Sequence, residues 1–285
     1  MKCARFQQHG RCGVTYSTLM VHLDAGRTNA AVLDATATLA SHYNAKVIGI
    51  AACQPVQLGA CDGYIDGEFA VLERDIVTDA LAHAKAEFHA HEALRPHVIE
   101  WRSIPTLENV AHAVATQSRC ADLLVTGVGP PPGDPSTHAD TGDLVIRAGR
   151  PVLVVPQANV TAAFRNILVA WTDTRECRRA ILDALPLLHG ADRVTLVVAS
   201  SDPAAAQDGT SDTVNWLRRH GIDADRIVSR MTGSGSETLA VIADEVGADI
   251  VVAGAYGHSR IREWTFGGVT RDLLLQARRC TLLAH

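Results

Sequence analysis

The sequence predicts an α/β fold in which two doubly wound domains each hold a five-stranded, mainly parallel sheet. One sign is an internal repeat, since Ser17–Ala52 resembles Arg165–Ser200 and later segments recur in the same order. The other is that the strand-like runs are continuously apolar, as in strands covered on both faces of a parallel sheet. Right-handed crossovers between such strands place helices on both faces. The doubly wound layout is therefore expected twice in one chain.

The repeat consists of three pairs of segments. These pairs are Ser17–Ala52 with Arg165–Ser200, Cys120–Gly129 with Gly247–Gly257, and Ala148–Pro156 with Ala277–His285. Their spacing indicates that the first copy holds roughly twenty more residues between its second and third strands, and Gln54–Phe69 is the expected place for them. We expect an N-terminal extension over residues 1–16, a first domain over 17–156, a linker over 157–164 and a second domain over 165–285.

In the second copy, apolar runs alternate with segments of helical period. Strands are expected over Asn166–Trp171, Val194–Ala199, Arg226–Arg230, Ile250–Gly254 and Thr281–Ala284. Helices are expected over Arg175–His189, Thr210–His220, Ser236–Val246 and Trp264–Ala277. Ser236 is the expected N-cap of the third of these helices. The first copy should repeat the same alternation because its segments match.

The last strand-like run of each copy is short and apolar. Pro151–Val155 and Cys280–His285 would each end a sheet and leave unpaired backbone groups at its edge. Antiparallel pairing between the two runs would cover both edges. We therefore expect the domains to pack as an intramolecular pseudo-dimer, so that any homodimer of the whole chain would use another surface.

Composition and charge exclude several classes of protein. The 285 residues are 47% hydrophobic and 20% charged, with a net charge of −5. The sequence has no stripe of basic residues of the kind that binds nucleic acid. It also has no apolar run near the ~20 residues that a helix needs to cross a membrane. The seven cysteines form no C-x-x-C pair, which favours reduced thiols in a cytoplasm. His89 and His91 would diverge on a helix, so no metal site is expected.

The segment "GAYGHSRIREWTFGGVT" (Gly254–Thr270) is the strongest functional signal. It follows an apolar strand, and its glycines at 254, 257, 267 and 268 would let backbone N–H groups approach phosphate oxygens. His258 and Thr270 would add further donors. A tight turn after the strand would explain Gly254 and Gly257 equally well, and the spacing alone leaves both interpretations open.

The strand order, the duplication and the G-x2-G-x9-G spacing of Gly254, Gly257 and Gly267 resemble the universal stress protein family, in particular its tandem-domain members. The resemblance implies two flavodoxin-like (Rossmann-like) domains. It also implies that ATP, accompanied by Mg²⁺, binds in the second domain, with the glycine segment on the phosphates and ribose. The implied nucleotide-binding residues are Ala170, Trp171, Thr172, Asp173, Gly254, Gly257, His258, Gly267, Gly268, Val269 and Thr270.

Two positions of the second copy depart from the family pattern. Gly268 stands where the family has Ser or Thr. Thr172 stands at the tip of the first strand, where the family places an Asp near the adenine, and Asp173 follows it. Trp171 and Trp264 would flank the glycine site and stack on a base, but core packing is favoured for Trp264, because its neighbours Thr265 and Phe266 suggest a helix face.

The first copy keeps the tip aspartate, Asp24, but loses the glycine segment. Pro130–Pro132 interrupt that segment and lack the N–H groups that would hold a phosphate. Three carboxylates nearby would also repel phosphate, namely Asp134, Asp140 and Asp143. We therefore expect the first copy to be scaffold rather than site.

The sequence favours a cytoplasmic stress-response protein that binds an adenine nucleotide and acts by binding, not by catalysis. No G-x-S-x-G elbow follows a strand, which argues against a serine hydrolase. A slow nucleotide hydrolase is one alternative, with Asp173 or His258 as the base. A structural dimerisation module without a ligand is another. The expected partners are the nucleotide and a second copy of the chain, without nucleic acid or membrane.

Overall fold

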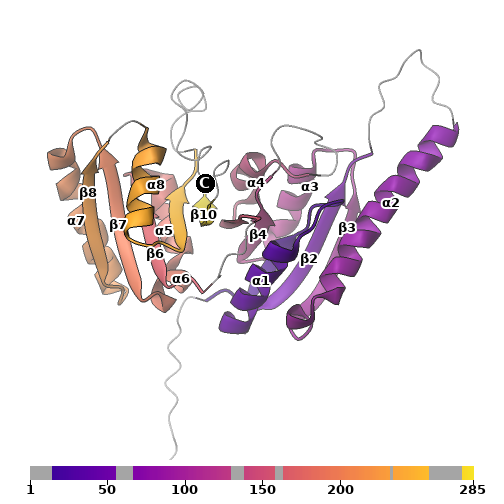
Figure 1. Ribbon diagram of the computed structural model, residues 1–285, viewed down its shortest axis with the longest axis horizontal. Coiled ribbons are helices and arrows are strands. Elements are labelled where there is room, and N and C mark those ends of the chain that lie inside the picture. Colours follow the sequence, from indigo (N-terminus) through magenta and orange to yellow (C-terminus); the bar gives the residue numbers. More distant parts are fainter. Residues whose placement is uncertain (1–14, 56–66, 130–137, 158–162, 232–233, 257–277) are drawn as a thin grey trace, which may run out of the picture.

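A computed structural model describes residues 15–55, 67–129, 138–157, 163–231, 234–256 and 278–285. Their strands form one ten-stranded sheet in the order β3-β2-β1-β4-β5-β10-β9-β6-β7-β8 (Figure 1). Five neighbouring strands come from the first half of the chain and five from the second. Within each half the order 3-2-1-4-5 is that of a Rossmann-type sheet. The predicted α/β class is therefore confirmed.

The first half alternates parallel strands with helices. Its strands are β1 (Thr18–His22), β2 (Lys46–Cys53), β3 (Val98–Pro105), β4 (Leu123–Gly127) and β5 (Val152–Val155). Its helices are α1 (Ala30–Tyr43), α2 (Gly67–Ala90), α3 (Val110–Gln117) and α4 (Thr141–Ala148). Short 3₁₀ turns lie at Glu92–Leu94 and Ser118–Cys120.

The second half repeats this alternation. Its strands are β6 (Asn166–Ala170), β7 (Arg193–Ser200), β8 (Ala224–Arg230), β9 (Ile250–Gly254) and β10 (Cys280–Ala284). Its described helices are α5 (Arg175–Asp183), α6 (Leu185–Gly190), α7 (Pro203–Arg219) and α8 (Gly235–Glu245). All five predicted strands are present, and β9 has the predicted bounds. The predicted helix Trp264–Ala277 lies outside the described residues.

Two predicted helices of the second half begin or end elsewhere. The expected helix Arg175–His189 is broken at Ala184 into α5 and α6, because Pro186 has no N–H with which to continue the helical hydrogen bonds. Helix α7 begins at Pro203, seven residues before the expected Thr210. Proline suits the first position of a helix, where its missing N–H costs nothing.

The prediction that Ser236 caps the third of these helices is wrong. Ser234 is the N-cap of α8, and its hydroxyl accepts a hydrogen bond from Glu237 N at 3.1 Å. The Glu237 carboxylate in turn accepts one from Ser234 N at 2.9 Å. This reciprocal pair is a capping box, and it satisfies two backbone donors where a cap at Ser236 would not.

The two halves join edge to edge. Strands β5 and β10 are antiparallel, with Leu153 directly opposite Leu282, and every residue of both strands is buried. The predicted pairing of the last strand of each half is confirmed. It removes two exposed sheet edges, because each strand supplies hydrogen-bonding partners to the other.

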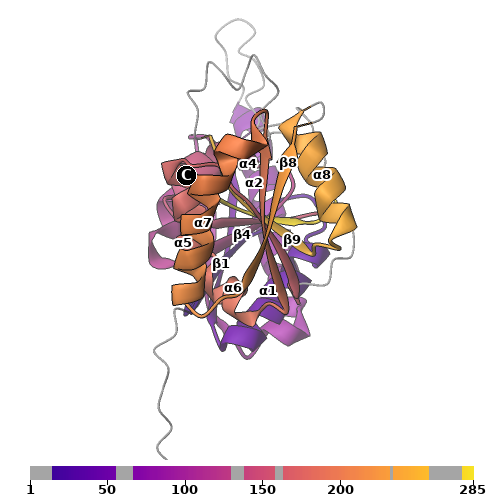
Figure 2. The ribbon, with the colours of Figure 1, turned by 90° about the vertical axis from the view of Figure 1, so that its left-hand side faces the viewer.

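Helices cover both faces of the sheet (Figure 2). On what we call the α1 face, α1, α2, α5, α6 and α7 pack into one hydrophobic cluster. On the opposite side, the α3 face, α3, α4 and α8 pack into a second cluster. Successive strand residues alternate between the two, as Val169 does with Ala170. Burial on both faces is the reason why the strands are continuously apolar.

Candidate functional site

The strand order reverses once in each half, between β1 and β4 and between β6 and β9. Doubly wound sheets bind ligands at such a point, outside the carboxyl ends of the strands. In the second half, Ala170 at the end of β6 is in register with Ala253 of β9. The structure thus brings the predicted tip residues Ala170–Asp173 next to the predicted Gly254.

The remaining predicted site residues lie outside the described part of the chain. They are Gly257, His258, Gly267, Gly268, Val269 and Thr270. The prolines expected to disable the first copy, Pro130–Pro132, and the indole of Trp264 also lie outside it. The part that these residues take in a site stays a prediction.

The tip after β6 turns at once into helix α5. Thr174 is the N-cap of α5, and its hydroxyl accepts a hydrogen bond from Cys177 N at 3.3 Å. Its own amide donates to Thr172 O at 2.7 Å. Thr172 and Asp173 are exposed, and Asp173 Oδ1 forms an ion pair with Arg178 Nη2 at 2.5 Å. The carboxylate of Asp173 is therefore already engaged by a cation.

Side chains at the tip point to opposite faces of the sheet. Trp171 is 8% exposed and belongs to the hydrophobic cluster of the α1 face. Trp171 therefore packs in the core, and its predicted stacking on a base stays a prediction. Ala170 and Ala253 belong to the α3 face. On that face the ends of β6 and β9 carry only methyl groups, which take little of the space above the sheet.

Gly254 ends β9 and faces the start of helix α5. A Cβ here would lie 2.6 Å from the carbonyl carbon of Glu176 and 2.9 Å from Cα of Cys177. Both are backbone atoms, so neither can rotate aside. The close approach of α5 to β9 therefore requires glycine at this position. This packing cause is neither of the two interpretations that the sequence left open for Gly254, which were a phosphate contact and a tight turn.

A buried carboxylate stands beside this contact. Glu176 is 2% exposed and accepts a hydrogen bond from Arg175 Nε. Burial by itself raises the pKa of the Glu176 carboxyl, but the hydrogen bond and charge of Arg175 bring it below its usual value. Sequence analysis missed Glu176, although an acidic residue in the first turn of a helix is a recognisable signal, because the helix dipole favours it there.

The reversal point of the first half holds a cluster of titratable side chains. Asp24 follows β1, and its Oδ1 lies 3.6 Å from Nδ1 of His138, which precedes α4. Burial by itself raises the pKa of Asp24, but His138, His22 and Arg27 together hold it below its usual value. Sequence analysis singled out Asp24 and missed both histidines, since neither lies next to it in a recognisable motif.

His22 is the last residue of β1, two residues before Asp24. It is 1% exposed, its Nδ1 lies 3.0 Å from Thr126 Oγ1, and its Nε2 is buried without a hydrogen-bond partner. Burial lowers the pKa of His22, and the charge of Asp24 only partly opposes this effect. The repeat places Ala170 and Ala253 at the positions of His22 and Thr126, so the second half carries methyl groups in place of this polar pair.

The lowered pKa of His22 predicts a pH dependence of stability. Below its ordinary pKa of about 6.5, the unfolded chain takes up a proton that the folded protein resists. The contribution of His22 is therefore complete above that pH and is lost as the pH falls toward the folded pKa. We expect His22→Ala, which copies Ala170, to lose less free energy of unfolding than the parent between about pH 7.5 and about pH 5.5.

Urea unfolding of both proteins at the two pH values measures the difference. Replacement of the exposed His89 by Ala is the control. An equal loss of stability in the parent and in His22→Ala would contradict the assignment.

The start of α4 carries a carboxylate of its own. Asp140 is the N-cap of α4, and its side chain accepts a hydrogen bond from Asp143 N at 2.7 Å. Just after β4, Gly129 N donates to Thr141 Oγ1 at 3.1 Å. Backbone donors that could hold a phosphate at a helix start are here bound by protein side chains. This is a physical reason for expecting scaffold rather than site in the first half.

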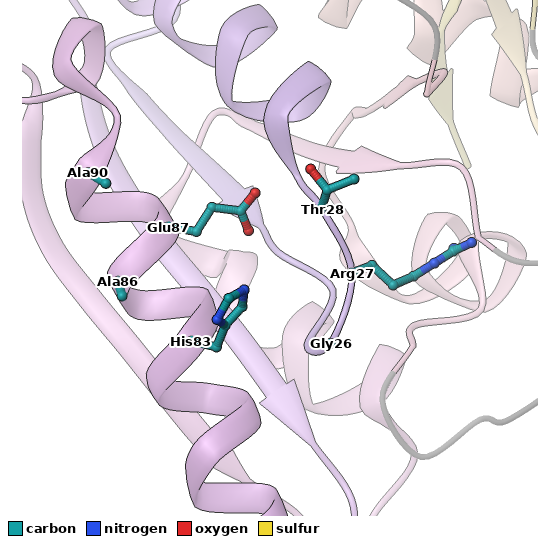
Figure 3. A pocket seen from close by; sticks show the side chains of 7 residues that line it. All are labelled: Gly26, Arg27, Thr28, His83, Ala86, Glu87 and Ala90. Atoms are coloured by element: carbon teal, nitrogen blue, oxygen red, sulfur yellow. The ribbon is translucent and has the colours of Figure 1, made fainter.

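An open hollow of about 580 Å³ lies between the loop after β1 and helix α2 (Figure 3). It is lined by Gly26, Arg27, Thr28, His83, Ala86, Glu87 and Ala90. His83 and Glu87 point toward the loop, whereas the side chain of Arg27 points away from α2. Glu87 Oε1 accepts from Asn29 N at 2.7 Å, and its Oε2 accepts from Asn29 Nδ2 at 2.8 Å. Glu87 thus ties α2 to the start of α1.

The described part of the chain holds neither a cluster of metal ligands nor a helix that could span a membrane. No three His, Cys, Asp or Glu side chains in this part of the chain come together so that they could hold a metal ion. No helix there is both long and apolar enough to span a membrane. Among the described cysteines, Cys120, Cys177 and Cys280 are free thiols.

Comparison with known proteins identifies a domain in the second half. Residues 163–284 match the model of the universal stress protein family. The chain is similar in structure to a universal stress protein from Archaeoglobus fulgidus, with a TM-score of 0.70 and 12% identity over 94% of this chain and 95% of that one.

A functionally unknown protein from Pseudomonas aeruginosa gives a TM-score of 0.57 at 13% identity, over 94% of this chain and 92% of that one. At these identities the two likenesses show the fold. No curated protein sequence matches this chain.

Proposed function

We propose that the second half of this protein binds an adenine nucleotide, with ATP as its ligand, and that the protein acts through this binding and not through catalysis. The match to the universal stress protein family covers that half. The observation that carries the proposal is the meeting of the β6 tip with the end of β9 at the reversal point of the sheet. The glycine segment Gly254–Thr270 begins at that same point.

The glycine segment that follows β9 supports a nucleotide as the ligand. The spacing of Gly254, Gly257 and Gly267 is the one that the family resemblance links to ATP, and backbone N–H groups of glycine-rich turns suit phosphate oxygens. The triphosphate would be accompanied by Mg²⁺, which such ligands bring with them. On the α3 face, the ends of β6 and β9 bring only the methyl groups of Ala170 and Ala253 to this point.

A comparison of the two halves favours the second as the site. The sequence "TGDLVIRA" (Thr141–Ala148) matches "TRDLLLQA" (Thr270–Ala277), which puts Val269 at the position of the N-cap Asp140. Valine brings no carboxylate to that position. The second half therefore lacks, by sequence, the N-cap carboxylate of the first half, although Asp272 stands at the position of Asp143.

Binding without turnover follows from what phosphoryl transfer needs. Hydrolysis requires a positioned water, a metal and cationic clamps on the transferred group. Asp173, one of the two residues that the sequence offered as a base, is held by Arg178. We place the protein in the cytoplasm, in line with its scattered cysteines, and assign any homodimer to a surface other than β5 and β10.

Calorimetric titration with ATP and magnesium tests the proposal. We expect one nucleotide per chain, and we expect Gly257→Val to abolish binding, because a branched side chain would take the space of the phosphate. The control is Gly209→Val, since a Cβ at Gly209 has no neighbour within 4 Å. Binding that survives Gly257→Val would sink the assignment. Steady phosphate release that disappears in Asp173→Ala would overturn the statement that the protein does not catalyse.

A further inference from the structure

Strand β3 closes one end of the ten-stranded sheet, and no other described strand pairs with its outer edge (Figure 1). Ile99, Glu100, Ser103 and Pro105 of β3 are exposed, whereas every residue of the paired strands β5 and β10 is buried. A free edge offers backbone N–H and C=O groups to another strand. Strand β3 is therefore open to pairing with a second chain.

The hydrogen bonds between β3 and β2 show which residues of β3 face the free edge. Thr106 N donates to Cys53 O at 3.0 Å, so residue 106 directs its N–H group toward β2. The register with β2 is regular over the last six residues of β3. Because successive residues direct their backbone groups to opposite edges of a strand, Trp101, Ser103 and Pro105 face outward. Proline at such a position takes no hydrogen bond from β2.

Two opposite charges flank Trp101 on this strand. The carboxylate of Glu100 accepts hydrogen bonds from Arg102 Nε at 2.8 Å and from Arg102 Nη2 at 2.9 Å. In an antiparallel pair of two β3 strands centred on Trp101, Glu100 of each copy lies opposite Arg102 of the other. A pair centred on Arg102 would instead bring two arginines together. Charge therefore favours the register centred on Trp101.

The ring of Trp101 leaves room for this approach. It packs on Phe88, with the ring centroids 5.1 Å apart, and a Cβ at Gly49 of β2 would lie 2.6 Å from its Cε3. The indole thus leans inward over β2, away from the free edge. The outward backbone groups of Trp101 can then exchange hydrogen bonds with the same groups of a second copy.

We propose that β3 is the surface through which two copies of this chain pair, antiparallel and centred on Trp101. Each copy uses the same residues, so the assembly closes at a dimer. The pairing goes beyond the proposed function, since it needs no nucleotide. The contact is short, and we therefore expect a reversible dimer with a dissociation constant on the order of micromolar.

Reversal of either charge tests the proposal by sedimentation of the full-length chain at about 50 μM. Arg102→Glu lines the two-fold axis with carboxylates only, and Glu100→Arg lines it with guanidinium groups only. We expect each change to weaken dimerisation by about tenfold or more, because like charges then lie opposite each other. Arg230→Glu is the control. Arg230 is exposed on β8, the strand at the other end of the sheet, and its reversal should leave the dimer unchanged.

Two rescue experiments separate the loss of charge pairing from damage to the fold. Glu100→Arg combined with Arg102→Glu restores an opposite charge to every position, and an equimolar mixture of the two single variants does so between unlike chains. Both should dimerise as the parent does. Urea unfolding checks that each variant is folded. If either reversal unfolds the chain, Ser103→Pro replaces it, because that change removes an outward N–H group as Pro105 does.

The outcomes decide the proposal in either direction. Loss of the dimer in the single variants and its return in both rescue experiments supports pairing through β3. A monomeric parent overturns the proposal, as does a dimer that survives both reversals or that Arg230→Glu dissociates. Single variants that no rescue experiment returns to dimers overturn it as well, because the register centred on Trp101 requires charge pairing between the copies.

Discussion

Replacing Gly254 by alanine is expected to lower the free energy of unfolding by about 3 kcal/mol. The added Cβ would lie well inside contact distance of Glu176 and Cys177, and these are backbone atoms of the first turn of α5. Relief requires the helix to move away from strand β9, which loosens the packing of Cys177 and of the neighbouring core. Urea unfolding of the purified variant measures the loss.

The repeat supplies a matched control for this prediction. Gly127 ends β4 as Gly254 ends β9, but a Cβ at Gly127 would meet only Val32 Cγ2, at 3.4 Å. That atom belongs to a side chain, and alanine in place of glycine also reduces the freedom of the unfolded chain. We expect Gly127→Ala to change stability by less than about 1 kcal/mol. Equal losses at the two positions would show that α5 does not require Gly254.

Leu153→Ala and Leu282→Ala are each expected to cost about 3 kcal/mol, because each removes a fully buried side chain. The two leucines face each other across the junction of β5 and β10, and both are 0% exposed. We expect the double variant to deviate from additivity by about 1 kcal/mol, since directly opposed residues share a cavity and a contact. A cycle of urea unfolding free energies measures this coupling between the halves.

Leu19 of β1 provides the comparison. It is also 0% exposed, but three strand spacings, about 14 Å, separate β1 from β10. Leu19→Ala and Leu282→Ala should therefore add within about 0.5 kcal/mol. Strict additivity of Leu153→Ala with Leu282→Ala would mean that the two halves are not coupled at this junction. It would contradict the coupling that we expect from the antiparallel register.

Much of the fold was accessible from the sequence because its signals are local and periodic. Continuous apolar runs predicted all five strands of the second half, and both ends of β9 were predicted correctly. The repeat, together with the short apolar run at the end of each copy, predicted the antiparallel junction of β5 and β10. The ends of helices were harder to predict from the sequence. Pro186, and the capping box of Ser234 with Glu237, each act through one or two residues, and the helical period of the surrounding sequence does not reveal them.

The candidate site was accessible only in part. The sequence predicted that the tip after β6 and the glycine at the end of β9 belong together, and the register of Ala170 with Ala253 places them side by side. The polar cluster of His22, Asp24 and His138 was missed. Its members come from β1 and from the segment before α4, and His22 bonds to a residue 104 positions away.

By itself, the sequence determined the fold class, the duplication and the pairing of the two halves, because these follow from the period and polarity of contiguous segments. Only the tertiary structure shows why Gly254 must be glycine. It also shows that the hydroxyl of Tyr256 in the second half lies against Gly142 of the first half. Both depend on the approach of a helix to residues distant in the chain. That approach is governed by close packing of buried surfaces, and no pattern of neighbouring residues encodes which backbone atom will lie against which.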